Sequence, residues 1–139
     1  HIMINYIAQA KKNPQTKTLS YYAQIAPVTP LKLDDIVRRI EKTCTVSSAD
    51  IKAVLDALQH EIVESLRAGN SVRLGDLGSF RATLSSSGVE APENVSASLI
   101  KSVRVRFTPG AKMNEIFGNL KALSFNRVEG VIKDETVTE

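Results

Sequence analysis

The first 25 residues contain two segments in which apolar and polar positions alternate with the period of a β-strand. The first segment carries Ile4, Tyr6 and Ala8 on one side, and the alternation resumes between Leu19 and Ile25. A basic, turn-forming stretch at residues 11–17 separates them. The pattern therefore predicts a β-hairpin, followed by a proline-interrupted linker at residues 26–32.

From residue 33 the apolar period lengthens to three or four, as in an amphipathic helix whose inner face carries Ile36, Val37 and Ile40. A second helix is expected to begin at Ser47, because Ser47 and Asp50 have the spacing of a capping box. It should end at Gly69, since glycine readily adopts the left-handed conformation that closes a helix. We expect Cys44 to continue the apolar face of the first helix as a buried, inert thiol.

Alternation returns after Gly69, in segments near residues 71–74, 80–85 and 103–108. If these strands form one sheet against the helices, their apolar positions cover the core. The opposite face then presents four arginines together, namely Arg73, Arg81, Arg104 and Arg106. A short amphipathic helix is expected after Pro109-Gly110, and the segment from residue 126 onward has no clear period, so we expect it to be disordered.

Composition excludes several classes of protein. The chain has 139 residues, 42% of them hydrophobic, which suits one modest domain. Its single cysteine cannot form an internal disulfide, and His1 and His60 have no metal-ligand spacing. We find no phosphate-binding glycine loop and no histidine suited to a catalytic triad, so we predict no enzyme activity, metal, cofactor or small-molecule substrate. No membrane-spanning apolar run or secretion pattern is found, which predicts a soluble cytoplasmic protein.

The net charge of +3 favours an anionic partner only weakly, whereas the four arginines are more informative. Guanidinium groups that project from one sheet face can contact phosphates and displace counterions. A merely solvated polar face is the alternative, and the alternation alone does not distinguish the two.

The chain also resembles the bacterial histone-like HU and integration host factor family. The resemblance runs from about residue 33 to 80 and again from 103 to 120, and it rests on the motifs Val46-Ser47-Ser48-Ala49-Asp50, Gly69, Val72-Arg73-Leu74, Leu77-Gly78-Ser79-Phe80 and Phe107-Thr108-Pro109-Gly110. Asn13-Pro14-Gln15 and Tyr21-Tyr22-Ala23 are similar to extended variants with an amino-terminal hairpin. This resemblance implies an α+β fold of two helices, a three-stranded antiparallel sheet with an arm, and a short carboxyl-terminal helix. It also implies an intertwined homodimer whose sheets form a saddle over double-stranded DNA.

The arm departs from the family pattern. Residues 85–102 carry Glu90 and Glu93, with only Lys101 near their end, where the family arm bears arginines. Pro92 falls close to the position of the proline that wedges between base steps, but it could equally order the loop. Lys112 stands one place beyond the usual basic position of the family.

The amino-terminal turn resembles a displaced arm tip. It combines Pro14 with the basic residues Lys11, Lys12 and Lys17. Either this turn has taken over DNA contacts from the acidic arm, or its lysines only keep a common turn soluble.

We therefore expect an extension at 1–32, an HU-like DNA-binding domain at 33–125 and a tail at 126–139. The expected function is that of a nucleoid-associated architectural protein, which binds and condenses duplex DNA with little base readout and bends it. The alternative is a dimeric structural or protein-interaction module with an HU-type core.

Overall fold

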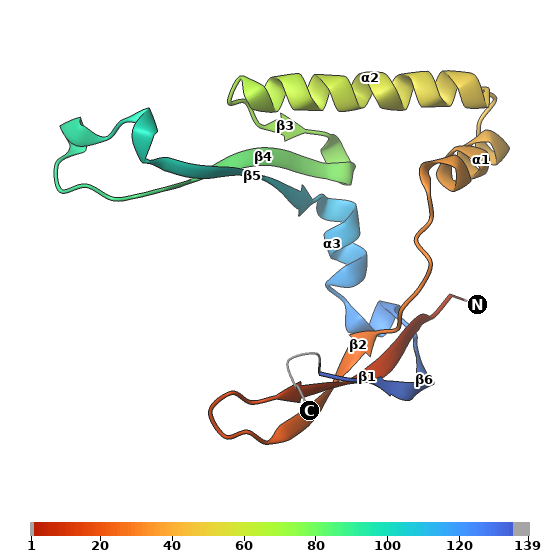
Figure 1. Ribbon diagram of the computed structural model, residues 1–139. Coiled ribbons are helices and arrows are strands. Elements are labelled where there is room, and N and C mark those ends of the chain that lie inside the picture. The colour runs from red at the N-terminus through yellow and green to blue at the C-terminus, as the bar shows by residue number, and fades with distance from the viewer. Residues whose placement is uncertain (1, 135–139) are drawn as a thin grey trace. The chain divides into compact units, whose positions relative to one another are not determined.

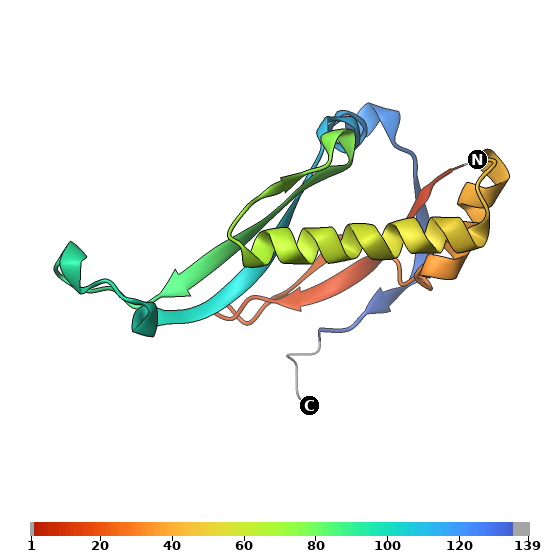
Figure 2. The ribbon, with the colours of Figure 1, turned by 90° about the horizontal axis from the view of Figure 1, so that it is seen from above.

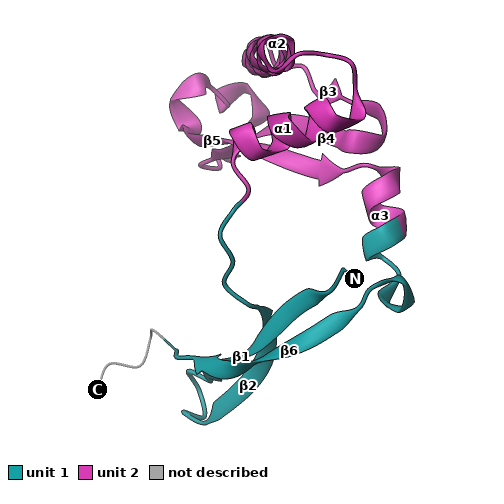
Figure 3. Cartoon of the chain, turned by 90° about the vertical axis from the view of Figure 1, so that its right-hand side faces the viewer, with its two compact units in different colours: residues 1–30, 116–139 teal, residues 31–115 magenta. Residues whose placement is uncertain are grey.

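The computed structural model describes residues 2–134 and has an α+β fold, as the sequence predicts. The chain divides into two compact units, which are coloured separately in Figure 3. One unit combines residues 1–30 with 116–139, and the other consists of residues 31–115.

The helices of the second unit begin where local hydrogen bonds satisfy their free backbone N–H groups. Helix α1 spans Leu33–Thr43, and the Asp35 carboxylate accepts a hydrogen bond from the Lys32 N–H at 2.9 Å. Helix α2 spans Ser48–Arg67, and the Ser47 Oγ accepts one from the Asp50 N–H at 3.2 Å. Each helix contributes one buried hydrophobic side chain to the core, Val37 from α1 and Ile51 from α2.

Three antiparallel strands follow in the order β3-β4-β5 (Figure 1). They span Val72–Arg73, Gly78–Ser86 and Ile100–Pro109, and helix α3 follows at Ala111–Phe117. Helix α2 packs against β3 and β4. The paired residues Phe80 and Phe107 bring their ring centroids to 5.1 Å, which anchors the start of β4 to the end of β5.

The stretch between β3 and β4 contains Gly75 and Gly78 and makes a tight bend. Residues Gly75–Leu77 form a single 3-10 turn. Gly78 follows at φ +140°, and a Cβ there would overlap the Thr108 carbonyl oxygen and the Phe107 ring. A Cβ on Gly110 would overlap the backbone carbonyl of Asp76. These close backbone approaches join the turn to the end of β5.

The first unit is a three-stranded sheet in the order β2-β1-β6. Strands β1 (Ile4–Lys12) and β2 (Leu19–Ile25) form the predicted antiparallel hairpin. The predicted disorder after residue 126 is wrong for strand β6 (Phe125–Ile132), which pairs in parallel with β1. The reason is that the free edge of β1 supplies backbone hydrogen-bond partners for β6. Residues 135–139 lie outside the described part of the chain.

Cys44 also differs from its prediction, because its side chain is exposed. Helix α1 ends at Thr43, and Cys44 caps it in an extended conformation, with φ −130° and ψ 161°. This conformation takes Cys44 off the helical periodicity that would have placed it on the apolar face. None of the helices within residues 2–134 is long and apolar enough to cross a membrane.

Candidate nucleic-acid interface

The strand register places the four arginines on one face of the β3-β4-β5 sheet. Arg81 lies opposite Arg106, Arg104 lies opposite Thr83, and Arg73 lies opposite Ser79. Directly paired residues point to the same side of an antiparallel sheet, and positions two apart along a strand share that side. The arginine face therefore consists of Arg73, Arg81, Arg104 and Arg106 with the hydroxyl residues between them.

All four arginines are exposed, and strands β3, β4 and β5 contain no Asp or Glu. The ion pairs found within residues 2–134 join other residues, in and between α1 and α2. The positive charge of the face is therefore not neutralised by carboxylates on these strands. Such a surface attracts a polyanion and can release the counterions that surround it.

Hydroxyl groups fill the positions between the arginines. The Arg81 Nη1 donates a hydrogen bond to the Thr108 Oγ1 at 3.0 Å, which orients that guanidinium across the strands. A shallow hollow of this face is lined by Thr83, Leu84, Ser85, Ser102, Arg104 and Arg106. Serine and threonine hydroxyls can donate to phosphate oxygens and so add to an arginine contact. These hydroxyl residues are not among the contacts that the sequence predicts, although the alternation that locates the arginines also places them.

The arm between β4 and β5 has little regular structure and extends beyond the ribbon of these two strands (Figure 2). Pro92 is exposed and begins a 3-10 turn, in which its carbonyl oxygen accepts a hydrogen bond from the Val95 N–H at 3.1 Å. Glu90 and Glu93 are also exposed. Lys101 lies at a break in the β4-β5 register, so the alternation that groups the arginines does not include it. Lys112 lies in the first turn of α3 and is exposed.

The remaining predicted residues lie in the other compact unit, at the tip of the β1-β2 hairpin. The Asn13 Oδ1 accepts hydrogen bonds from the N–H groups of Gln15 (2.9 Å) and Thr16 (3.4 Å), which closes the turn around an exposed Pro14. Lys17 reverses the chain at φ +59°. All three lysines of the tip are exposed: Lys11, Lys12 and Lys17.

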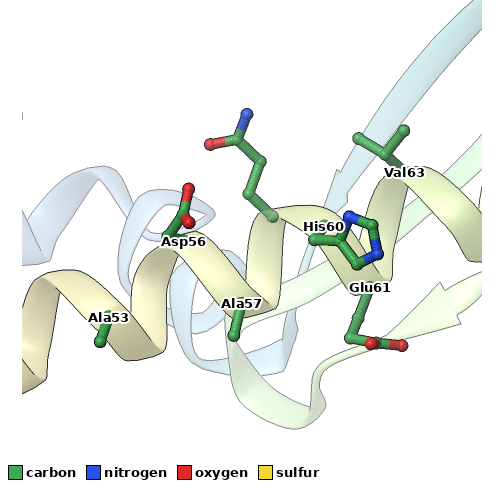
Figure 4. A pocket seen from close by; sticks show the side chains of 7 residues that line it. Ala53, Asp56, Ala57, His60, Glu61 and Val63 are labelled. Carbon is green, nitrogen blue, oxygen red and sulfur yellow. The ribbon is translucent and has the colours of Figure 1, made fainter.

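His60 lies on α2, among side chains that include Asp56 and Glu61 (Figure 4). Its side chain is exposed. Within residues 2–134 no group of three or more His, Cys, Asp or Glu side chains could hold a metal ion.

A family model described as "HU domain fused to wHTH, Ig, or Glycine-rich motif" matches residues 3–127. The chain belongs to this HU family. The resemblance inferred from the sequence motifs is thereby confirmed for this HU chain, and the match also includes the amino-terminal hairpin. No curated protein matches the sequence.

The HU chain is also similar in fold to a solved structure of a candidate bacterial DNA-binding protein from Bacteroides vulgatus ATCC 8482. The TM-score is 0.59 and the sequence identity is 17%. The match covers 96% of this chain but 51% of the other, so this HU chain spans about half the length of that protein.

Proposed function

We propose that this HU chain binds double-stranded DNA through its arginine face. The observation that carries the proposal is the set of four exposed arginines on strands without a carboxylate. Guanidinium groups hold phosphate oxygens through paired N–H donors and do so regardless of the base sequence. Binding should then follow phosphate positions and DNA shape, with little direct readout of base edges. Membership of an HU family supports the same partner.

We also propose that two copies form an intertwined homodimer. Few hydrophobic side chains are buried within residues 2–134, and many large ones remain exposed. They include Val54 and Val63 of α2, Leu84, Val103, Val105 and Phe107 of the sheet, and Met113, Ile116 and Phe117 in and around α3. Apolar surface of this extent usually marks an interface. A second copy would cover it with the same surface, as a two-fold symmetric contact requires.

The flanking basic residues extend this proposal. Lys101 and Lys112 would add phosphate contacts near the arginine face, while Lys11, Lys12, Lys17 and Pro14 would form a second contact at the hairpin tip. Either Pro14 or Pro92 would insert between base steps and bend the duplex, because a kinked step allows more protein surface to contact the DNA. Bending and charge neutralisation together would condense DNA in the nucleoid.

Fluorescence anisotropy with two unrelated duplexes of equal length tests the main proposal. We expect similar affinities for the two sequences and a steep, linear fall of log K with log salt concentration. Sedimentation of the same protein at micromolar concentration should give the mass of two chains. Binding that is absent or insensitive to salt would refute DNA binding through the arginine face. A cooperative melt with the mass of one chain would refute the dimer.

One observation favours a second candidate function. The exposed carboxylates of Glu90 and Glu93 in the arm would repel the DNA backbone. An HU-type dimer with this arm could serve instead as a structural or protein-interaction module. An intact dimer without measurable duplex binding would support this second function.

A further inference from the structure

The sheet of the first unit has one face centred on Tyr22. The register pairs Gln9 with Tyr22, Lys11 with Ser20, and Ile7 with Gln24. Gln9, Lys11, Ser20, Tyr22 and Gln24 therefore lie on the same side of the β1-β2 hairpin, together with the half-buried Ile7. Tyr22 is 54% exposed, and the Lys11 Nζ lies 5.7 Å from the centre of its ring.

Tyr21, which directly precedes Tyr22 on β2, points to the opposite side, which has a different chemical character. It lies across from Ala10, and this side also carries Tyr6 and Ile25. A shallow hollow on it is lined mostly by apolar residues, among them Ile4, Tyr6, Ile25 and Phe125. One side of the hairpin is thus mainly apolar, whereas the other carries mainly polar side chains around a single aromatic ring, that of Tyr22.

The charge around Tyr22 is positive. The β1-β2 hairpin contains the three lysines Lys11, Lys12 and Lys17 and no Asp or Glu. The acidic residues of this unit within the described part of the chain are Glu129, which lies in β6, and Asp134, which follows β6; this strand is the other neighbour of β1. The carboxylate of Asp134 accepts a hydrogen bond from the Lys12 backbone N–H at 2.6 Å, near the tip of the hairpin.

An exposed ring beside amide and ammonium groups matches the chemistry of an unpaired nucleotide. Aromatic side chains stack on bases of any identity, lysines follow the phosphates, and glutamine amides can both donate to and accept from base edges. Bases within a duplex are stacked on one another and cannot use such a ring. We propose that the Tyr22 face binds single-stranded nucleic acid, with Tyr22 stacked on an unpaired base and Lys11 contacting the adjacent phosphate.

The matched pair of adjacent tyrosines allows a sharp test in the full chain. Anisotropy is measured with labelled 15-nucleotide oligo(dT) and oligo(U), and with a duplex of equal length. Tyr22→Leu should weaken single-strand binding about fivefold or more, because it removes a stacked ring. Tyr22→Phe should restore it, and duplex affinity should change less than about twofold. Tyr21→Leu is the control, since it removes a similarly exposed ring from the opposite side.

The results separate this proposal from duplex binding by the arginine face. If Tyr21→Leu and Tyr22→Leu lose single-strand affinity equally, or if neither oligonucleotide binds the wild type, the Tyr22 proposal is overturned. Loss through Tyr22→Leu alone supports it, whichever of the two oligonucleotides binds more tightly. A wild type that binds single strands but not the duplex would overturn only the arginine-face proposal. Matching thermal melts of the variants exclude a difference in folding as the cause.

Discussion

Replacing Arg104 and Arg106 by alanine should weaken duplex binding and make it less sensitive to salt. Both arginines are exposed on β5 at positions two residues apart, so they face the same side without supporting the core. Each phosphate contact on duplex DNA contributes about 0.9 to the slope of log K against log salt concentration. The double variant should therefore have a slope shallower by about 1.8 for each copy that engages the DNA.

This slope difference translates into a measurable change in affinity. Between 50 and 200 mM salt the wild type should lose about tenfold more affinity than the double variant, for each engaged copy. Two unrelated duplexes should show the same loss, because phosphate contacts carry no sequence information. The assay is an anisotropy titration at four salt concentrations, with sedimentation to verify the assembly state of each variant.

Arg38→Ala is the matched control, since Arg38 is an exposed arginine of α1 that is already paired with Asp35. Its removal should leave the slope unchanged. An unchanged slope for the Arg104 and Arg106 variant, with its assembly intact, would refute the assignment of phosphate contacts to the arginine face.

Three further predictions concern bending and stability. Of the two candidate wedges we expect Pro14 to bend the DNA, because the lysines around it attract the phosphate backbone that Glu90 and Glu93 repel. Pro14→Ala should therefore reduce DNA bending measured by energy transfer, whereas Pro92→Ala should not; loss of bending through Pro92→Ala alone would assign the wedge to the arm. Gly110→Ala should lower the free energy of unfolding by about 1–3 kcal/mol in a urea titration, because the new Cβ overlaps a backbone carbonyl; unchanged stability would contradict that close approach. Hydrogen bonding from the Lys32 N–H, aided by a neighbouring arginine, lowers the pKa of Asp35 below its ordinary value. Its carboxylate therefore stabilises the fold above the ordinary pKa of aspartate, and this contribution is lost as the pH falls through the lowered value. Asp35→Asn should accordingly be less stable than wild type at pH 7, and the gap should narrow at pH 3; a gap of equal size at both pH values would contradict this reasoning.

Local sequence signals were sufficient for the helices and for the composition of the arginine face. The hydroxyl of Ser47 and the backbone of Asp50 are three residues apart, so the start of α2 depends on neighbours in the sequence. Side chains alternate between the two faces of a sheet, so the face of a strand residue depends on whether its position along the strand is odd or even. Residues of two strands share a face when the register pairs the expected positions of one strand with those of the other. The pairing of Arg81 with Arg106 meets this condition, so alternation alone was enough to group the arginines.

Tertiary structure decided what depends on partners distant in the sequence. Strand β6 has no clear alternation of its own, and it is ordered because Ile4 pairs with Phe125, 121 residues later. Gly130, at φ +112°, lies in the stretch where the β1-β6 register shifts. The break in register beside Lys101 likewise depends on the pairing of β5 with β4. The alternation of polar and apolar residues along β5 therefore does not reveal it. The alternation of side chains along a strand and the capping of a helix act over a few residues, so both can be predicted from the sequence. The neighbour of a strand and its register depend instead on which strand edge the rest of the fold leaves free for hydrogen bonding.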